Sequence, residues 1–256
     1  MFRLAQRLLV ATLVTLGTAC DVWEPPAPTA DELNRGLIVL YPGALNTRSE
    51  MLGFYSGLRA AGIDQAIEVR PWAPPLLNFF IPTEFLEYER PWAREEAARL
   101  AAHRAANPGS PVTLLGFSGG AMVCVLVGEE MPAGEQIDRI ILMSPGISTA
   151  YDLTRMLENT TDGAYVYWSA KDTVINFTTH WLGTLDGVFG PAAAAFGFEM
   201  EHPKLRQVSW SPALALFGNN GEHNDYAFSV EWIREFVAPW VAHFDAAKAD
   251  DTTPPA

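Results

Sequence analysis

Short, continuously apolar runs alternate with longer amphipathic runs along most of the chain, and this alternation constrains the fold more than any other feature. The apolar runs are rich in branched aliphatic and aromatic residues and end in turn residues, as buried strands do. They are GLIVLYPG (36–43), QAIEVRPW (65–72), PVTLLG (111–116), DRIILMSPG (138–146), GAYVYWSAKD (163–172) and LRQVSW (205–210). The intervening runs have helical spacing at 49–63, 91–110, 120–131, 149–159 and 225–247, the last interrupted at Pro239. This order predicts an α/β fold with a mostly parallel, doubly wound sheet and helices on both faces.

The first twenty residues have a different character from the rest. Arg3 and Arg7 precede an apolar run, and small residues lead up to Cys20. This layout is typical of a secretory signal peptide, and the apolar run is too short to favour a membrane span. The ending LGTAC is similar to a bacterial lipoprotein signal, although Gly17 stands where those signals usually have Leu. We therefore expect export to the periplasm or cell envelope, with lipidation of Cys20 as the more specific hypothesis and a buried first helix as the alternative.

Composition sets the remaining boundaries. Residues 21–35 are Pro-rich and polar, which predicts a tether, followed by a folded domain at 36–247 and a disordered tail at 248–256.

The net charge of −13, without clustered Lys or Arg, excludes a nucleic acid as partner. Apart from Cys20, Cys124 is the single cysteine, so no disulfide framework or cysteine metal site is expected, and Cys124 is interpreted as a small core residue.

Two long, aromatic stretches fit the alternation poorly. They cover residues 73–88 and 175–200 and are rich in turn residues. Insertions at the loop end of a parallel sheet are often pocket walls, and the alternative is ordinary core packing. On the first interpretation, four aromatic residues are candidates for the lining of an apolar acyl site: Phe79, Phe80, Trp181 and Phe189.

The sequence GFSGG places Ser118 between a predicted strand and a predicted helix. Gly-x-Ser-x-Gly in this context is the nucleophile elbow, in which a strained turn projects the serine hydroxyl above the sheet. Glycines at 116 and 120 keep the strand and the helix from clashing. The pattern predicts that Ser118 is a nucleophile, and the alternative is a tight packing turn.

A serine nucleophile needs a base and an acid that orients the base, and on this topology the acid precedes the histidine in the chain. Asp172 is the last residue of AYVYWSAKD and directly follows the predicted strand in it, so its carboxylate is expected at the same sheet edge as Ser118. Asp152 is the second candidate. Asp162 and Asp186 lie farther from a strand end and are interpreted as solvated loop charges.

His223 is the favoured base. It lies in the glycine-rich loop FGNNGEHNDY, immediately before the last long helix, and the alternative is an ordinary loop histidine. The other histidines fit less well because of their predicted positions: His103 on a polar helix surface, His180 only eight residues after Asp172, His202 in a polar stretch and His243 within the final helix.

An oxyanion hole requires two backbone donors. The N–H of Gly119 follows the nucleophile, and a second donor is expected in the loop after the first strand. Within YPGALN, Ala44 is the favoured donor, with Leu45 or Asn46 as alternatives. The alternative interpretation of this loop is a simple Pro-Gly turn.

Together these motifs resemble the α/β-hydrolase superfamily across residues 37–246. The resemblance implies Ser118 as nucleophile, His223 as base, Asp172 as acid, and Ala44 with Gly119 as the oxyanion hole. It also implies that the strand GLIVLYPG corresponds to the third strand of the family. The sequences GNNGEHND and YWSAKD look similar to exported bacterial hydrolase-like proteins of undefined substrate. Where many esterases have His-Gly-Gly, this chain has Tyr41-Pro42-Gly43, which leaves the second oxyanion donor open.

These residues predict a serine hydrolase that cleaves a small-molecule carboxylic ester through an acyl-enzyme, without a metal or organic cofactor. The same triad would serve a peptidase, thioesterase or acyltransferase, because pocket shape selects the bond. A non-catalytic surface lipoprotein with this fold is a third interpretation. Oligomeric state is left open by the sequence.

Overall fold

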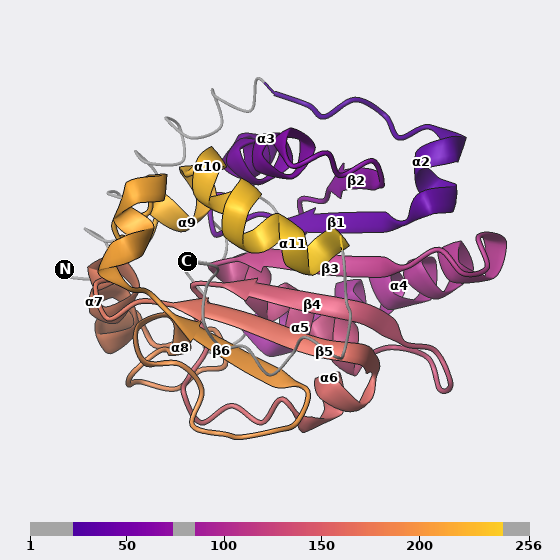
Figure 1. Ribbon diagram of the computed structural model, residues 1–256. Coiled ribbons are helices and arrows are strands. Elements are labelled where there is room, and N and C mark those ends of the chain that lie inside the picture. The colour runs from indigo at the N-terminus through magenta and orange to yellow at the C-terminus, as the bar shows by residue number, and fades with distance from the viewer. Residues whose placement is uncertain (1–22, 74–84, 243–256) are drawn as a thin grey trace.

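Six parallel strands form the centre of the computed structural model, which describes residues 23–73 and 85–242 (Figure 1). The strands lie in the order β2-β1-β3-β4-β5-β6. Their bounds are β1 Leu37–Tyr41, β2 Ala66–Val69, β3 Val112–Phe117, β4 Ile137–Met143, β5 Thr160–Trp168 and β6 Leu205–Ser209. Every paired register is parallel, so all six carboxyl ends meet at one edge of the sheet. No strand precedes β1 within the described residues.

Two apolar layers cover the sheet, as the continuously apolar strands predict. Along β1, Leu37 and Val39 face one core cluster, whereas Ile38 and Leu40 face the other. The first layer packs under α4 (Phe85–Ala106), α5 (Gly119–Glu129) and α6 (Thr154–Glu158). The second packs under α3 (Leu52–Ala60) and the C-terminal helices (Figure 1). Sequence-based assignment of the doubly wound α/β fold is therefore confirmed.

Helix α4 begins earlier and ends earlier than the predicted 91–110. Pro91 lies inside the helix, whereas the sequence predicts a helix that starts at this proline. A proline costs one backbone hydrogen bond, and the helix-favouring residues around it maintain the helix on both sides. The helix ends at Ala106, before Gly109 adopts a positive φ of 84°. The Pro-Gly pair at 108–109 therefore does follow the end of the helix, but the helix ends about one turn before residue 110.

Glu89 on α4 gives the protein a pH-dependent stability. Its side chain is buried, its Oε1 has no hydrogen-bond partner among the described residues, and burial raises the pKa of its carboxyl from 4.5 to about 7. Between those two values the folded protein retains a proton that the unfolded chain releases, so stability falls as pH rises. We expect Glu89→Gln to raise the free energy of unfolding by roughly 2–3 kcal/mol at pH 8 and to leave it unchanged at pH 4.

Urea unfolding at both pH values measures this effect. Exposed Glu95, on the same helix, is the control, because Glu95→Gln should change stability little at either pH. An equal effect of Glu89→Gln at pH 4 and pH 8 would contradict the assigned protonation.

The C-terminal segment is not one helix interrupted at Pro239. It consists of α9 (Asp225–Phe228), α10 (Val230–Trp232), a π-helical turn η5 (Ile233–Val237) and α11 (Ala238–Ala242). Ser229, at φ −82° and ψ 87°, breaks it after the first turn. The wide turn precedes Pro239, whose ring would otherwise meet the carbonyl four residues earlier. The prediction of a single break at the proline was therefore wrong.

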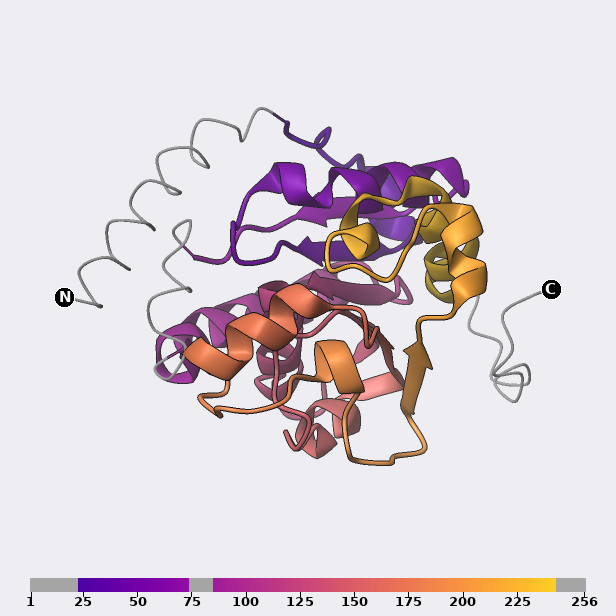
Figure 2. The same cartoon turned by 90° about the vertical axis from the view of Figure 1, so that its left-hand side faces the viewer.

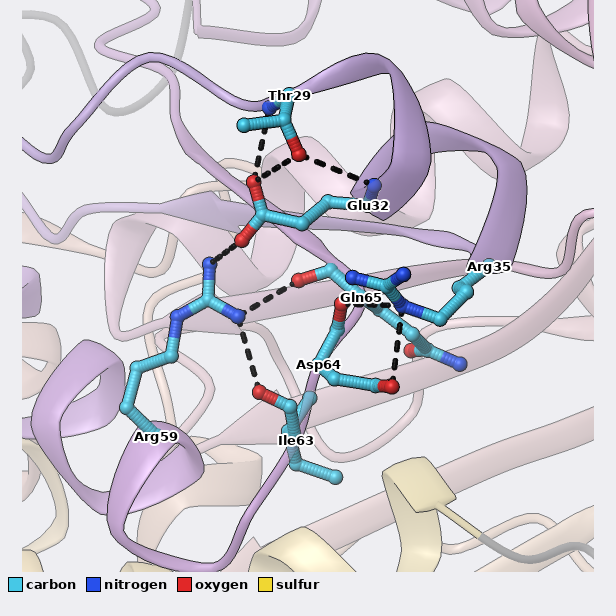
Figure 3. A network of polar contacts seen from close by, with 7 residues as sticks. All are labelled: Thr29, Glu32, Arg35, Arg59, Ile63, Asp64 and Gln65. Carbon is cyan, nitrogen blue, oxygen red and sulfur yellow. Dashed lines mark hydrogen bonds and ion pairs between the residues drawn. The ribbon is translucent and has the colours of Figure 1, made fainter.

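Part of the predicted tether is helical. Helix α2 (Ala30–Arg35) starts with a capping box, in which Thr29 and Glu32 each bond the other's backbone N–H. Glu32 also pairs with Arg59 at 2.9 Å, and Arg59 donates to the carbonyls of Ile63 and Gln65 (Figure 3). These bonds attach α2 to the end of α3 and the start of β2. The spacing Thr-x-x-Glu carried the signal for this helix, which proline content obscured.

Several predictions lie outside the described residues. They are the signal peptide and Cys20, the tail at 248–256, Phe79, Phe80 and His243. Cys124 is buried on α5 as predicted, and burial raises the pKa of its thiol. Within the described ranges, no helix is both long and apolar enough to cross a membrane.

Candidate active site

Ser118 lies at the carboxyl edge of the sheet, directly after β3 and immediately before α5. Its φ of 52° and ψ of −112° are strained for a residue with a Cβ. The flanking glycines permit this turn, because a Cβ on Gly116 would lie 2.2 Å from the Gly120 carbonyl oxygen. One on Gly120 would lie 2.1 Å from the Tyr41 oxygen. The local geometry that the motif predicts is therefore present around Ser118.

Asp172 and His223 contact each other in the buried part of the same edge. The distance from Asp172 Oδ2 to His223 Nδ1 is 2.7 Å. Asp172 is fully buried and is the N-cap of α7 (Thr173–Leu182), where its Oδ1 accepts the N–H of Ile175 at 3.0 Å. Because a carboxylate only accepts hydrogen bonds, Nδ1 of His223 is the donor. Nε2 is then the ring nitrogen left to act as a base.

One cavity of about 220 Å³ joins Ser118 to His223, since both side chains line it. The ring of Phe117 lies against the imidazole, with centroids 4.9 Å apart. No hydrogen bond joins the Ser118 hydroxyl to His223, so the structure brings these residues to one cavity without closing the contact between them. Catalytic hydrogen bonds often tighten only when substrate binds.

Two backbone amides flank the cavity beside Ser118. A Cβ built on Gly119 would lie 3.6 Å from the backbone nitrogen of Ala44, so these predicted oxyanion donors are neighbours. The alternative donor Asn46 is engaged in the turn, because its N–H donates to the Gly43 carbonyl at 3.0 Å. Its side-chain oxygen accepts the N–H of Trp72, which braces the loop. Ala44 and Leu45, by contrast, both line the cavity.

Ser144 is a residue of this cluster that the sequence analysis missed. Its buried hydroxyl donates to Asp172 Oδ2 and lies 3.1 Å from His223 Nδ1. Phe117 of β3 pairs with Met143 of β4, so Ser144 occupies the strand-end position next to that of Ser118. Its φ of 48° is also positive. The available signal was a serine directly after a predicted strand, within DRIILMSPG.

Ser144 and Ser118 differ in their positions relative to His223. Ser144 lies on the Nδ1 side, where Asp172 already binds, and it has no solvent exposure. Ser118 lines the cavity. A nucleophile must reach both substrate and the free imidazole nitrogen, so this geometry favours Ser118 over Ser144.

The competing acids have other partners. Asp152 is exposed and accepts the N–H of Thr154, and hydrogen bonding to the side chain and then the backbone of Thr154 lowers the pKa of its carboxyl. Asp162 pairs with Arg139 at 2.9 Å, and Asp186 accepts the N–H of Ser148 at 2.8 Å. The interpretation of Asp162 and Asp186 as solvated charges was therefore wrong. Both hold neighbouring elements together.

The competing histidines are absent from the cavity lining. His103 is half-buried on α4 beside Asn107, and burial lowers its pKa, so its position is less exposed than predicted. His180 is exposed on α7, and His202 accepts the N–H of Lys204 at 3.1 Å. In the described part of the chain, no group of three or more His, Cys, Asp or Glu side chains is placed to hold a metal ion.

Trp181 and Phe189 are absent from the cavity lining, contrary to the prediction, and their side chains are 66% and 65% exposed. Helix α7 begins at the Asp172 cap, and this start fixes its rotation, with one face toward the cavity and the aromatic residues outward. The cavity wall is formed instead by smaller side chains of the same segment: Val174, Ile175, Thr178, Thr179, Leu182 and Leu185.

Comparisons with known proteins bear on the fold. No protein-family model matches the chain, and no curated protein does. Lipase B of Aspergillus fumigatus is similar in structure, with a TM-score of 0.53 and 12% identity over 89% of this chain and 58% of the lipase. This chain thus spans less than two thirds of the lipase.

Two further structures are similar at lower scores. A predicted CIB-like hydrolase from Thermoplasma acidophilum has a TM-score of 0.48 and 16% identity, over 84% of this chain and 88% of its own. A carboxylesterase from Mesorhizobium loti has a TM-score of 0.43 and 14% identity, over 82% and 90%. At these identities the comparisons describe the fold alone.

Proposed function

Because this chain has the α/β-hydrolase fold, we propose that it is a serine hydrolase that cleaves carboxylic esters. The observation that carries the proposal is the 2.7 Å contact between Asp172 and His223, at a cavity that Ser118 also lines. Fold alone does not confer activity, so the proposed activity depends on this site.

The proposed reaction has two halves. Ser118 Oγ attacks the ester carbonyl carbon while His223 Nε2 takes the hydroxyl proton, and the carbonyl oxygen becomes an anion facing the N–H groups of Gly119 and Ala44. The carbon–oxygen bond to the alcohol then breaks, and the alcohol leaves with that proton. Water repeats the sequence on the acyl-enzyme, releases the acid and restores Ser118. Asp172 holds the imidazole with Nδ1 protonated throughout.

The cavity supports an ester with an apolar acyl group. Its wall on the α7 side consists of aliphatic side chains and threonines, and Leu45 and Leu185 add to this apolar surface. Glu50 and Asn224 are the other polar side chains of the lining, besides these threonines and the two proposed catalytic side chains. An apolar wall gains free energy from burying hydrocarbon and offers few groups for a peptide backbone. An assay of matched ester, thioester and amide substrates with one acyl group tests this choice. We expect the ester to have the highest kcat/KM, and faster amide cleavage would favour a peptidase.

Ser144 acts in this scheme as a positioning residue. Its hydroxyl donates to Asp172 Oδ2, the oxygen that also binds His223, and thereby holds the carboxylate against the imidazole. We expect Ser144→Ala to reduce kcat/KM by roughly tenfold or more. The loss should fall on kcat and leave KM within about twofold, since Ser144 is not among the residues that line the cavity.

Ser148→Ala is the matched control. Ser148 is also a buried serine that donates to an aspartate, but its partner is Asp186. This variant should leave kcat within about twofold. A Ser144→Ala variant with an unaltered kcat would show that Ser144 only fills space.

A further inference from the structure

Residues 173–198 form an uncharged stretch on an acidic protein. They contain no Lys or Arg and a single carboxylate, whereas the whole chain has a net charge of −13. That carboxylate belongs to Asp186 and accepts hydrogen bonds from the N–H and the hydroxyl of Ser148. The remaining titratable side chain is that of His180. The stretch therefore exposes almost no charge to a partner.

The same stretch exposes large apolar side chains. Phe177 is 71% exposed, and its ring lies 6.5 Å from that of Trp181. Phe189 reaches back over the end of α7, because a Cβ on Gly183 would lie 3.7 Å from its ring. We call these residues, with their exposed neighbours, the apolar face: Val174, Phe177, Trp181, Val188 and Phe189. Contiguous exposed groups of this kind usually mark an interaction site.

The apolar face is continuous with the mouth of the cavity. Val174 belongs to both, since it is 49% exposed and lines the cavity. Leu45, from the loop that carries the proposed oxyanion donor, is likewise 44% exposed and lines the cavity. Figure 2, which looks onto the carboxyl edge of the sheet, shows α7 in front of that edge. A surface that covered the apolar face would therefore also lie against the cavity mouth.

We propose that the apolar face binds an uncharged lipid–water interface and that the enzyme takes its ester substrate from that surface. Tryptophan and phenylalanine side chains gain free energy at the boundary between headgroups and acyl chains. A protein of net charge −13 whose contact face has no cation is matched to a neutral or zwitterionic surface rather than an anionic one. The substrate class named here rests on the proposed hydrolase function, but binding to the surface does not.

The test uses the full chain with Ser118→Ala, so that binding is measured without turnover. Sucrose-loaded phosphatidylcholine vesicles are sedimented with this protein and with the same protein carrying Phe177→Ser and Trp181→Ser. We expect the double change to weaken binding on the order of tenfold or more. Leu216→Ser with Phe228→Ser is the matched control, since those side chains are 87% and 55% exposed outside the apolar face, and it should bind normally.

Activity gives an independent readout in the otherwise unsubstituted protein. Phe177→Ser with Trp181→Ser should leave the rate of hydrolysis of a dissolved short-chain ester within about twofold of the rate of the unsubstituted protein. The same double change should lower the rate of hydrolysis of a water-insoluble ester, supplied as an emulsion, on the order of tenfold. Inactivity of the unsubstituted protein on every ester would refute the proposed function and leave the binding result standing. Equal vesicle binding with and without the double change would overturn the inference, as would a requirement for anionic lipid. The inference would also be overturned if the sole effect of the double change were the loss of a dimer.

Discussion

Ser118→Ala is expected to reduce ester hydrolysis by roughly a factor of 10⁶ in kcat. The substitution removes the oxygen that would form the acyl-enzyme, and no other hydroxyl in the cavity lies on the strained turn between β3 and α5. The measurement is steady-state hydrolysis of a p-nitrophenyl ester by the purified variant. Because alanine keeps the Cβ, the backbone strain at φ 52° is unchanged and the thermal midpoint should move little.

Ser144→Ala provides the comparison for this result. Both serines follow adjacent strands at the same edge, but nucleophilic attack is proposed for Ser118 alone. Loss of Ser144 should therefore leave much more activity than loss of Ser118. The reverse order would transfer the role of nucleophile to Ser144 and refute the proposed chemistry.

Asp172→Asn is expected to lower kcat by roughly a factor of 10⁴. Asp172 Oδ1 caps α7, and an asparagine oxygen can keep that bond to Ile175, so the amide nitrogen would face His223. A donor at that position disfavours the protonated Nδ1 and places the proton on Nε2, the nitrogen that must act as the base. Activity and urea unfolding of the same preparation separate this effect from loss of structure.

The matched control is Asp152→Asn. Asp152 was the second candidate for the acid, but the structure places it at an exposed helix start, where it accepts the N–H of Thr154. This variant should retain nearly full activity. If Asp152→Asn were inactive and Asp172→Asn remained active, the contact between Asp172 and His223 would not contribute to catalysis.

The fold and most of the candidate cluster were predictable because both follow from strand ends. Parallel strands bring their carboxyl ends to one edge, so a serine after β3 and an aspartate shortly after β5 necessarily converge there. His223 was predictable from its glycine-rich loop before the last helical segment. Its contact with Asp172 depends on a tight approach, since a Cβ on Gly221 would lie 2.8 Å from Ser169 Oγ.

Features that depend on helix rotation and on contacts distant in sequence were not predictable. The Asp172 cap sets where α7 starts, and the cap therefore decides that Trp181 faces outward and Thr179 inward. The role of Ser144 requires the pairing register of β3, β4 and β5, which no local pattern reveals. In each case the deciding interaction joins separate parts of the chain.

Labelling with a fluorophosphonate probe, followed by peptide mass spectrometry, tests the central claim most directly. The probe reacts only with a serine that a base has activated, so it reports the proposed cooperation of Ser118, His223 and Asp172 without knowledge of the substrate. We expect one adduct per chain, on Ser118, and its loss in the Asp172→Asn variant. No adduct, or an adduct on Ser144, would contradict the account.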